Sequence, residues 1–312
     1  MELKKESLKL SVSVILALIF TILLIFFPRG GYYGEIPMKL EDGAFQGFQL
    51  SLFFEVYQTN ITQFFQHIWE HQSLGGTMFS ETSVEKELIR YYPKSLLIIA
   101  IGFAVSIIFG VLKGIFDYRN TYTKKNLLGN GTTRLFQSIP DFFVVIIAFY
   151  LAFYYLPMGL IFSNKNWYSF AAPALLVSIY PTMYVARMTC VSLLNQDGQD
   201  YIRTAFAKGF KVRQVINRHI LRNSALDLIA HLPTIMMVVI SNMLMVEYLT
   251  GYAGAGNRMF VALGGRQNTV GFGTPDIEAG LVFGFALCFI ATVLVVHIVK
   301  MIMLTKLSQK GA

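Results

Sequence analysis

The chain has 312 residues, of which 54% are hydrophobic and only 14% carry a charge. Soluble domains carry about 25% charged residues, so this composition excludes an ordinary soluble enzyme and indicates a bundle of membrane helices. Basic residues outnumber acidic ones by 26 to 18, a balance that fits either nucleic acid or a membrane surface, depending on where the charges lie.

Six apolar runs are long enough to cross a bilayer, and they predict an all-α integral membrane protein with six transmembrane helices. The runs cover residues 10–27, 95–116, 139–155, 170–188, 228–246 and 281–304. The first follows Lys4, Lys5 and Lys9 and lacks a small-residue cleavage site, so we expect a retained helix rather than a removed signal peptide. Pro173 and Pro181 interrupt the fourth run, which a helix within a membrane bundle tolerates.

These spans divide the chain into three parts. Residues 1–27 would form an N-terminal transmembrane helix, residues 28–92 an extracytoplasmic segment, and residues 93–306 a five-helix core with an inner loop at 189–225. The extracytoplasmic segment holds apolar residues at helical spacing, which predicts an amphipathic helix lying on the outer interface. Those apolar residues are Ile61, Phe64, Phe65, Ile68 and Trp69.

The basic residues predict the orientation of the chain. With six spans, 18 of the 26 basic residues fall on the side that holds both termini and the loops after the second and fourth spans. The positive-inside rule makes that side cytoplasmic. We therefore expect a multi-pass protein of the cytoplasmic membrane with both termini inside, and nucleic acid is not needed to explain the charge.

The loop between the fourth and fifth spans holds the most informative motif. Its residues Asp200 to Gly209 read D-Y-I-R-T-A-F-A-K-G. The acidic start predicts a short helix over 200–208, and Gly209 lies where a helix end takes a left-handed conformation. A second helix is expected from Lys211. The residues alone leave two interpretations open: a docking helix for a cytoplasmic partner, or a basic loop that is merely helical.

This motif, together with R-H-I-L-R-N at Arg218–Asn223, closely resembles the inner-loop signature of ABC-transporter permeases of the oligopeptide/dipeptide/nickel importer branch. An outer stretch from Met243 to Gly256, M-L-M-V-E-Y-L-T-G-Y-A-G-A-G, resembles that family's V-E-x-x-F-x-x-P-G-x-G. The chain departs from the family at Ala253, where the family has proline. It also has F-P-R-G-G after the first span, where P-G-D-P is usual, and the solute (oligopeptide, dipeptide, nickel or another) stays open.

The resemblance implies a permease subunit that forms half of a translocation pathway and works by alternating access. Its partners would be a second homologous permease, two cytosolic ATPase subunits and an extracytoplasmic substrate-binding protein. ATP and magnesium would bind to the ATPases, so this chain would be no enzyme and bind no cofactor; it also lacks the G-x-x-x-x-G-K-[ST] motif. The helix docking on the ATPase would comprise Asp200, Tyr201, Arg203, Thr204, Ala205, Ala207, Lys208 and Gly209.

Polar residues within the predicted spans are candidates for the pathway, and residues after the fifth span are candidates for an outer gate. The pathway candidates are Ser178, Ser241 and Asn242, although Asn242 fits an interhelix contact equally well. The gate candidates are Glu247, Gly254 and Gly256.

Two other functions deserve comparison with the importer. A self-contained, ion-coupled secondary transporter is the alternative, but the chain has no clearly central acidic residue and no two matching halves. The sequence H-I-W-E-H at His67–His71 matches the H-x-x-E-H zinc pattern. Because no third ligand is evident nearby, we expect an interfacial helix there and no metal site.

Overall fold

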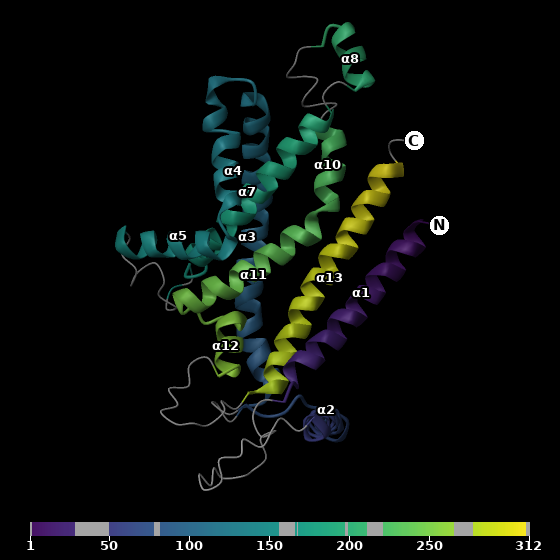
Figure 1. Cartoon of the computed structure of the whole chain (residues 1–312), viewed down its shortest axis with the longest axis vertical. Helices are drawn as coiled ribbons and strands as arrows, with labels where there is room; N and C mark the ends of the chain where they lie inside the picture. The colour runs from purple at the N-terminus through teal and green to yellow at the C-terminus, as the bar shows by residue number, and fades with distance from the viewer. Residues whose placement is uncertain are drawn as a thin grey trace. The chain divides into compact units, whose positions relative to one another are not determined.

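A computed structural model of the chain describes residues 2–28, 50–77, 82–155, 166, 168–196, 199–210, 221–264 and 277–309. Over these residues the regular structure is helical, with a single isolated bridge between Gly76 and Ser83 (Figure 1). Tertiary contacts divide the chain into two compact units. One comprises Met1–Tyr92 and Arg258–Ile290, and the other comprises Pro93–Asn257 and Ala291–Ala312.

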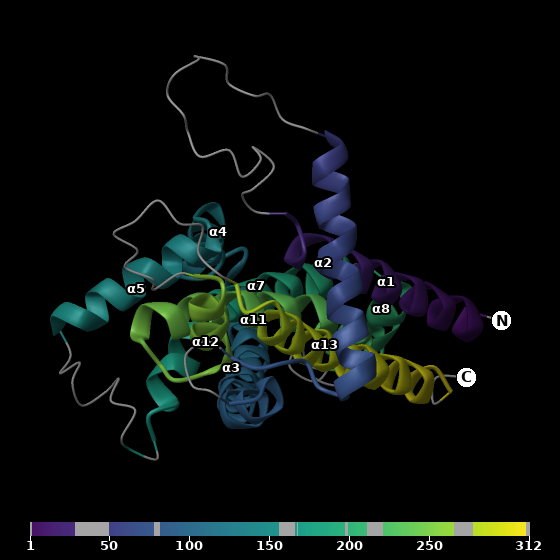
Figure 2. The same cartoon turned by 90° about the horizontal axis from the view of Figure 1, so that it is seen from below.

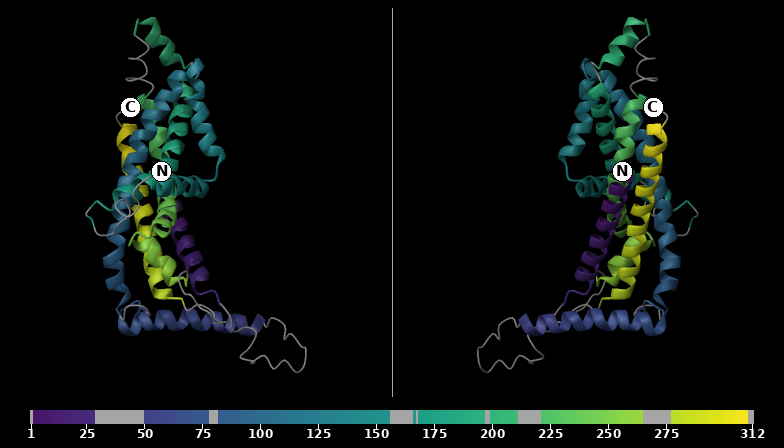
Figure 3. Two further views of the ribbon diagram at one scale, coloured as in Figure 1. Left: turned by 90° about the vertical axis from the view of Figure 1, so that its left-hand side faces the viewer. Right: turned by 90° about the vertical axis from the view of Figure 1, so that its right-hand side faces the viewer.

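The first unit is built around the N-terminal helix and the helix of the predicted outer segment. Its elements are α1 (Glu2–Ile25), α2 (Leu50–His71), the start of α3 (Val84–Asn120), most of α12 (Ala255–Ala262) and the start of α13 (Ala279–Gln309). Aromatic side chains join these helices: the Phe64 ring lies 4.7 Å from that of Phe26 and 5.5 Å from that of Phe283. Figures 2 and 3 show α2 lying across the direction of α1.

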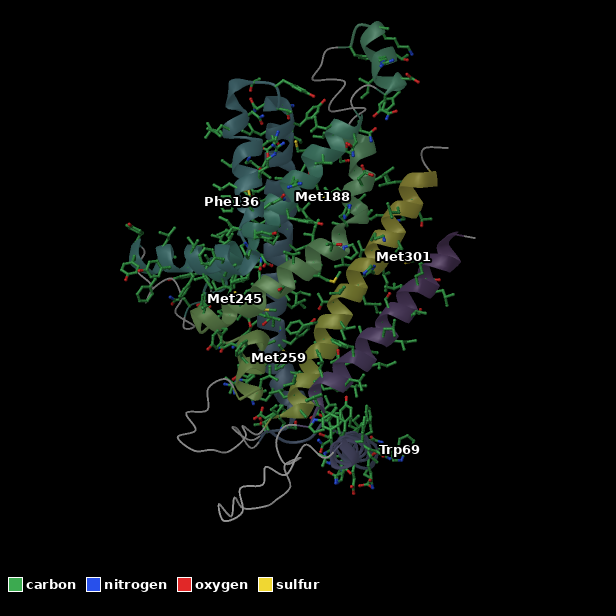
Figure 4. All side chains as sticks on the ribbon, in the orientation of Figure 1. Trp69, Phe136, Met188, Met245, Met259 and Met301 are labelled. Carbon is green, nitrogen blue, oxygen red and sulfur yellow. The ribbon has the colours of Figure 1, made fainter. Side chains whose placement is uncertain are left out.

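A helix, α2, covers the stretch in which the amphipathic helix is predicted, and its apolar residues are divided between two environments. Phe64 packs inside the unit, whereas Trp69 is 87% exposed and points away (Figure 4). The Tyr57 hydroxyl donates to the Leu23 carbonyl oxygen at 2.7 Å, and burial raises the pKa of this phenol. The location of α2 at a membrane interface stays a prediction.

The second unit is organised around α7, which packs against several other helices. Its elements are α3 from Pro93, η1 (Lys124–Leu127), α4 (Asn130–Ser138), α5 (Asp141–Tyr155), α7 (Ala171–Gln196), α8 (Asp200–Ala207), α10 (Leu221–Ala230), α11 (Leu232–Thr250), the start of α12 and the end of α13. The most extensive contacts of α7 are with α4, α5, α10 and α11. Because α7 is central, many of its side chains are buried despite the predicted interruption at Pro181.

Glycines bring α3 and α7 into close contact. A Cβ at Gly110 would lie 2.5 Å from the Cβ of Val185, and one at Gly114 would lie 2.5 Å from the Ala186 carbonyl oxygen. This G-x-x-x-G spacing is the arrangement by which membrane helices bring their backbones together. The spacing of the two glycines is visible in the sequence, but the sequence does not show that α7 is the helix that packs against them.

Five helices are long and apolar enough to cross a membrane: α1, α3, α7, α11 and α13. The third predicted span, 139–155, is α5, which has 15 residues and is bent by 103° from α4. Ile139 between them is extended because the following Pro140 disfavours helical backbone at the residue before it. The described residues therefore contain five helices that could span a membrane, or six spans if the bent pair crosses as one.

Candidate functional site

The predicted docking helix is present as α8. Asp200 stands in its first turn, and the Thr204 hydroxyl donates to the Asp200 carbonyl oxygen at 2.8 Å. Gly209 has a φ of +79°, which confirms the left-handed helix end expected at this glycine. Figure 1 shows α8 beyond the ends of α7 and α10, at one extremity of its unit, and the views in Figure 3 agree.

One side of α8 is anchored on the helices beneath it. Ile202 is buried against Leu193 of α7, and Ile115 and Tyr118 of α3 pack on the same cluster. The Tyr201 hydroxyl donates to Gln196 Oε1 at 2.6 Å. This side chain contact and this hydrogen bond tie α8 to the end of α7.

The opposite side of α8 is exposed. Its exposed residues are Asp200, Arg203, Thr204 and Ala207, and Lys208 and Gly209, which follow the helix, are exposed too. No atom lies within 4 Å of the place where a Cβ on Gly209 would stand. Ala205 lies within α8, but its side chain is outside the described residues, as is most of the predicted second helix at 211–220. The chain resumes with α10 at Leu221.

The three gate candidates meet at the turn between α11 and α12. Glu247 is completely buried, and its carboxylate oxygen Oε2 accepts hydrogen bonds from the backbone N–H groups of Gly256 at 2.7 Å and Asn257 at 3.3 Å. A Cβ on Gly254 would overlap the carboxylate. The pKa of the neighbouring Tyr252 phenol is raised by burial and, to a smaller degree, by the negative charge of Glu247.

The three pathway candidates occupy different environments. Ser241 is exposed on α11, whereas Asn242 is 2% exposed and its amide nitrogen Nδ2 has no hydrogen-bond partner among the described residues. Ser178 is buried in α7, and its hydroxyl donates to the Leu175 carbonyl oxygen at 2.7 Å. A buried amide without a partner is costly in an apolar surrounding. Of the three candidates, Asn242 is the one whose burial is not offset by a hydrogen bond of this amide nitrogen to another described residue.

An ion pair between a partly exposed lysine and a buried aspartate near the end of α3 was not foreseen. Asp117 is fully buried, forms an ion pair with Lys113 one turn earlier, and accepts a hydrogen bond from the Thr133 hydroxyl of α4 at 2.5 Å. Lys113 also donates to the Gly129 carbonyl oxygen at 3.1 Å. The spacing of Lys113 and Asp117 was a signal for their pairing, but the burial depends on the fold of the 121–129 turn.

The first unit holds a second buried charge cluster that was also missed. Arg258 of α12 donates through Nε to Glu87 Oε2 at 2.8 Å and through Nη2 to Glu278 Oε2 at 2.7 Å. All three residues are at least nine-tenths buried. They come from distant parts of the chain, so no local sequence pattern could have joined them.

The histidine motif forms part of α2. The rings of His67 and His71 stack with centroids 4.5 Å apart, and His71 Nδ1 lies 3.3 Å from the His67 carbonyl oxygen. Among the residues that the structure describes, no group of three or more His, Cys, Asp and Glu side chains gathers as a metal site requires.

The sequence is similar to those of known transport proteins. Residues 106–309 match the family described as "Binding-protein-dependent transport system inner membrane component". A putative peptide transport system permease protein of Brucella abortus (strain 2308) is 25% identical over 230 residues, covering 70% of this chain and 72% of the relative. The oligopeptide transport system permease protein OppB of Escherichia coli (strain K12) is 26% identical over 212 residues, 64% of this chain and 67% of OppB.

A solved structure shares the fold. A chain of the inward-facing MetNI methionine ABC transporter superposes with a TM-score of 0.56 at 14% sequence identity. The match covers 70% of this chain and 95% of the other.

Proposed function

The chain belongs to the family of binding-protein-dependent transport system inner membrane components, and from this premise we propose that it is the permease subunit of an ATP-driven importer of peptides or a related small solute. The observation that carries this proposal furthest is the geometry of α8. The helix is anchored through Ile202 on one side and exposes Arg203, Thr204 and Lys208 on the other. Such a helix can bind a partner and transmit its movement.

The proposed mechanism is alternating access driven from the cytoplasmic side. ATP would close two partner ATPase subunits, and a groove on one of them would hold the exposed side of α8. Because Ile202 packs on Leu193 and on the end of α3, a displacement of α8 would reach α7 and α3 as a movement of rigid helices. A second homologous permease would supply the other half of the pathway, and ATP and magnesium would be bound by the ATPases alone.

Peptides are the proposed cargo because the named relatives are peptide permeases. Asn242 and Ser241 on α11, and Ser178 on α7, remain the proposed pathway residues, and Glu247, Gly254 and Gly256 the proposed outer gate. A substrate-binding protein would deliver the solute from outside, and both termini would lie in the cytoplasm. Mass spectrometry of the solute that co-purifies with the binding protein and the intact complex would identify the cargo, with a metal chelate as the competing result.

Gly209 offers a sharp test of docking. Replacing it with glutamate would place a bulky anion just beyond the end of α8, and we expect ATP-driven uptake to fall about tenfold or more. Gly209→Asn is the matched control, because asparagine also tolerates a φ of +79° and carries no charge. Immunoblots of membrane fractions would establish that both variants insert equally, and normal uptake by Gly209→Glu would contradict the proposal.

The same preparation separates the importer from a secondary transporter. Vesicles that contain this chain alone should show no uptake when an ion gradient is imposed, and uptake should require the ATPase subunits and ATP. Ion-driven uptake by the chain alone would favour the self-contained carrier.

A further inference from the structure

Glu247 is a carboxylate in the interior of its unit, and it is the one residue of α11 with a charged side chain. Its exposed fraction is zero. A buried carboxylate without partners is strongly unfavourable, so the groups that satisfy it indicate what it holds in place. Oε1 accepts from the Ser95 hydroxyl at 2.5 Å, and Oε2 accepts from the N–H groups of Gly256 and Asn257 at 2.7 and 3.3 Å.

The two amides belong to the first turn of α12, which begins at Ala255. The first N–H groups of a helix have no partner within the helix, and the helix dipole adds a positive field at that end. Such ends bind anions such as phosphate or carboxylate in many proteins. Here the anion is a side chain of the preceding helix, and the Asn257 amide group reinforces the turn by donating to the Tyr252 carbonyl oxygen at 2.9 Å.

Two glycines leave the space that the carboxylate fills. A Cβ on Gly254 would overlap the Glu247 carboxylate, and a Cβ on Gly256 would lie 3.0 Å from Oε2 and 3.0 Å from Leu244 Cδ2. Neither glycine has a positive φ, so close approach and not backbone conformation accounts for them. The turn is therefore shaped around the carboxylate.

Ser95 extends the cluster to a third helix. Its hydroxyl donates to Glu247 and accepts from the N–H group of Ala255 at 2.7 Å, and Ser95 itself is fully buried in α3. One carboxylate and one hydroxyl thus satisfy three consecutive amides at the start of α12. The hydrogen bonds join α3, α11 and α12.

We infer that Glu247 is a positioning residue of the importer, whose carboxylate binds the first turn of α12 and, through Ser95, fixes that turn to α3. The start of α12 then follows α11 and α3 as one body when the pathway opens and closes. The consequence for transport rests on the proposed function, whereas the anchoring of α12 is a property of the chain alone.

Hydrogen–deuterium exchange on the intact transporter complex in nanodiscs tests the anchoring. Glu247→Gln keeps the shape of the side chain but removes its charge, and we expect the amides of Gly256 and Asn257 to exchange about tenfold faster, because charge-assisted hydrogen bonds contribute that much. Ser95→Ala should accelerate exchange at Ala255. Glu55→Gln, at an exposed carboxylate of α2, is the matched control and should change neither.

The amount of solute imported per ATP hydrolysed tests the role in transport. This ratio should fall in Glu247→Gln. In a variant that is merely less stable, the rates of solute import and of ATP hydrolysis would fall in proportion, so that the ratio would not change. Unchanged exchange at Gly256 and Asn257, or an unchanged ratio despite faster exchange, would overturn the inference. If Glu247→Gln does not assemble into the complex, the same two measurements, amide exchange in the first turn of α12 and solute imported per ATP hydrolysed, test the inference with Ser95→Ala.

The exchange result does not depend on the proposed function. Absence of ATP-driven uptake in the unmodified complex would refute the importer while leaving the anchoring of α12 intact.

Discussion

Three buried carboxylates show three ways of satisfying a negative charge in an apolar chain. Asp117 pairs with a lysine one turn away, Glu87 pairs with Arg258, and Glu247 accepts from backbone amides and a serine hydroxyl. Each arrangement removes a cost that an unpaired buried charge would impose. Replacing one member of such a charged pair should therefore lower the stability of the fold more than replacing both members with apolar residues.

Lys113 provides the first prediction. Lys113→Met leaves Asp117 buried without its cation, and we expect a loss of about 3–5 kcal/mol in the free energy of unfolding. The double variant Lys113→Met/Asp117→Leu should recover much of this loss, because no buried charge remains. Thermal unfolding of the purified protein in detergent measures both, and equal stability of the single variant and the unmodified chain would contradict the prediction.

The glycines of α3 provide the second prediction. Gly110→Ala would place a Cβ 2.5 Å from Val185 Cβ, and overpacking of this kind costs about 1–3 kcal/mol. Gly102→Ala meets Val177 Cγ1 at a looser 3.2 Å and should cost less, while Gly76→Ala meets no atom within 4 Å. The midpoint of thermal unfolding should follow this order, and a Gly110 variant as stable as the Gly76 variant would refute the tight contact of α3 and α7.

Residues whose partners are near in sequence were predictable, and residues whose partners are distant were not. The left-handed Gly209 follows from the end of a short helix, and Glu247, Gly254 and Gly256 were grouped because all three stand in the outer stretch that resembles the family's motif. Ser95, which completes that cluster, lies 152 positions before Glu247. A serine at the start of an apolar run carries no local sign of such a partner.

Among the helices, α8 has one side that packs against α7 and α3 and an opposite side that is exposed. Ile202→Ala removes the side chain that packs against Leu193, and we expect α8 to lose about 2–5 kcal/mol of local stability. Amide exchange in α8 should accelerate, and ATP hydrolysis by the complex should continue with less uptake. Thr204→Ala, at an exposed position of the same helix, should leave the exchange unchanged.

If Ile202→Ala accelerates exchange in α8 but uptake and ATP hydrolysis stay coupled, then the movement reaches the pathway by contacts other than Ile202.

Helix existence was predicted well from apolar runs, because a long apolar run has few other solutions in a membrane. The exception is the third run. Its hydrophobicity indicated a span, but Ile139 is extended before Pro140 and a new helix begins at Asp141. This helix, α5, has 15 residues and is bent by 103° from α4. Hydropathy measures how apolar a segment is and not the direction in which it runs.

Whether α4 and α5 cross the membrane as one span decides the topology of the whole molecule. Five crossings would place the two termini on opposite sides of the membrane, whereas a sixth crossing by α4 and α5 would place them on the same side. The distribution of basic residues favours the second arrangement, because 18 of 26 then lie inside.

Single cysteines introduced into a cysteine-free chain can test the arrangement. The two native cysteines are Cys190 and Cys288, which would be replaced by alanine. Lys9→Cys and Lys306→Cys, at exposed positions near the two ends, should react with a membrane-impermeant maleimide only after permeabilisation. Trp69→Cys, on the exposed side of α2, should react in intact cells. If Lys306→Cys reacts in intact cells while Lys9→Cys does not, the number of crossings is odd, and α4 and α5 do not cross the membrane as a pair.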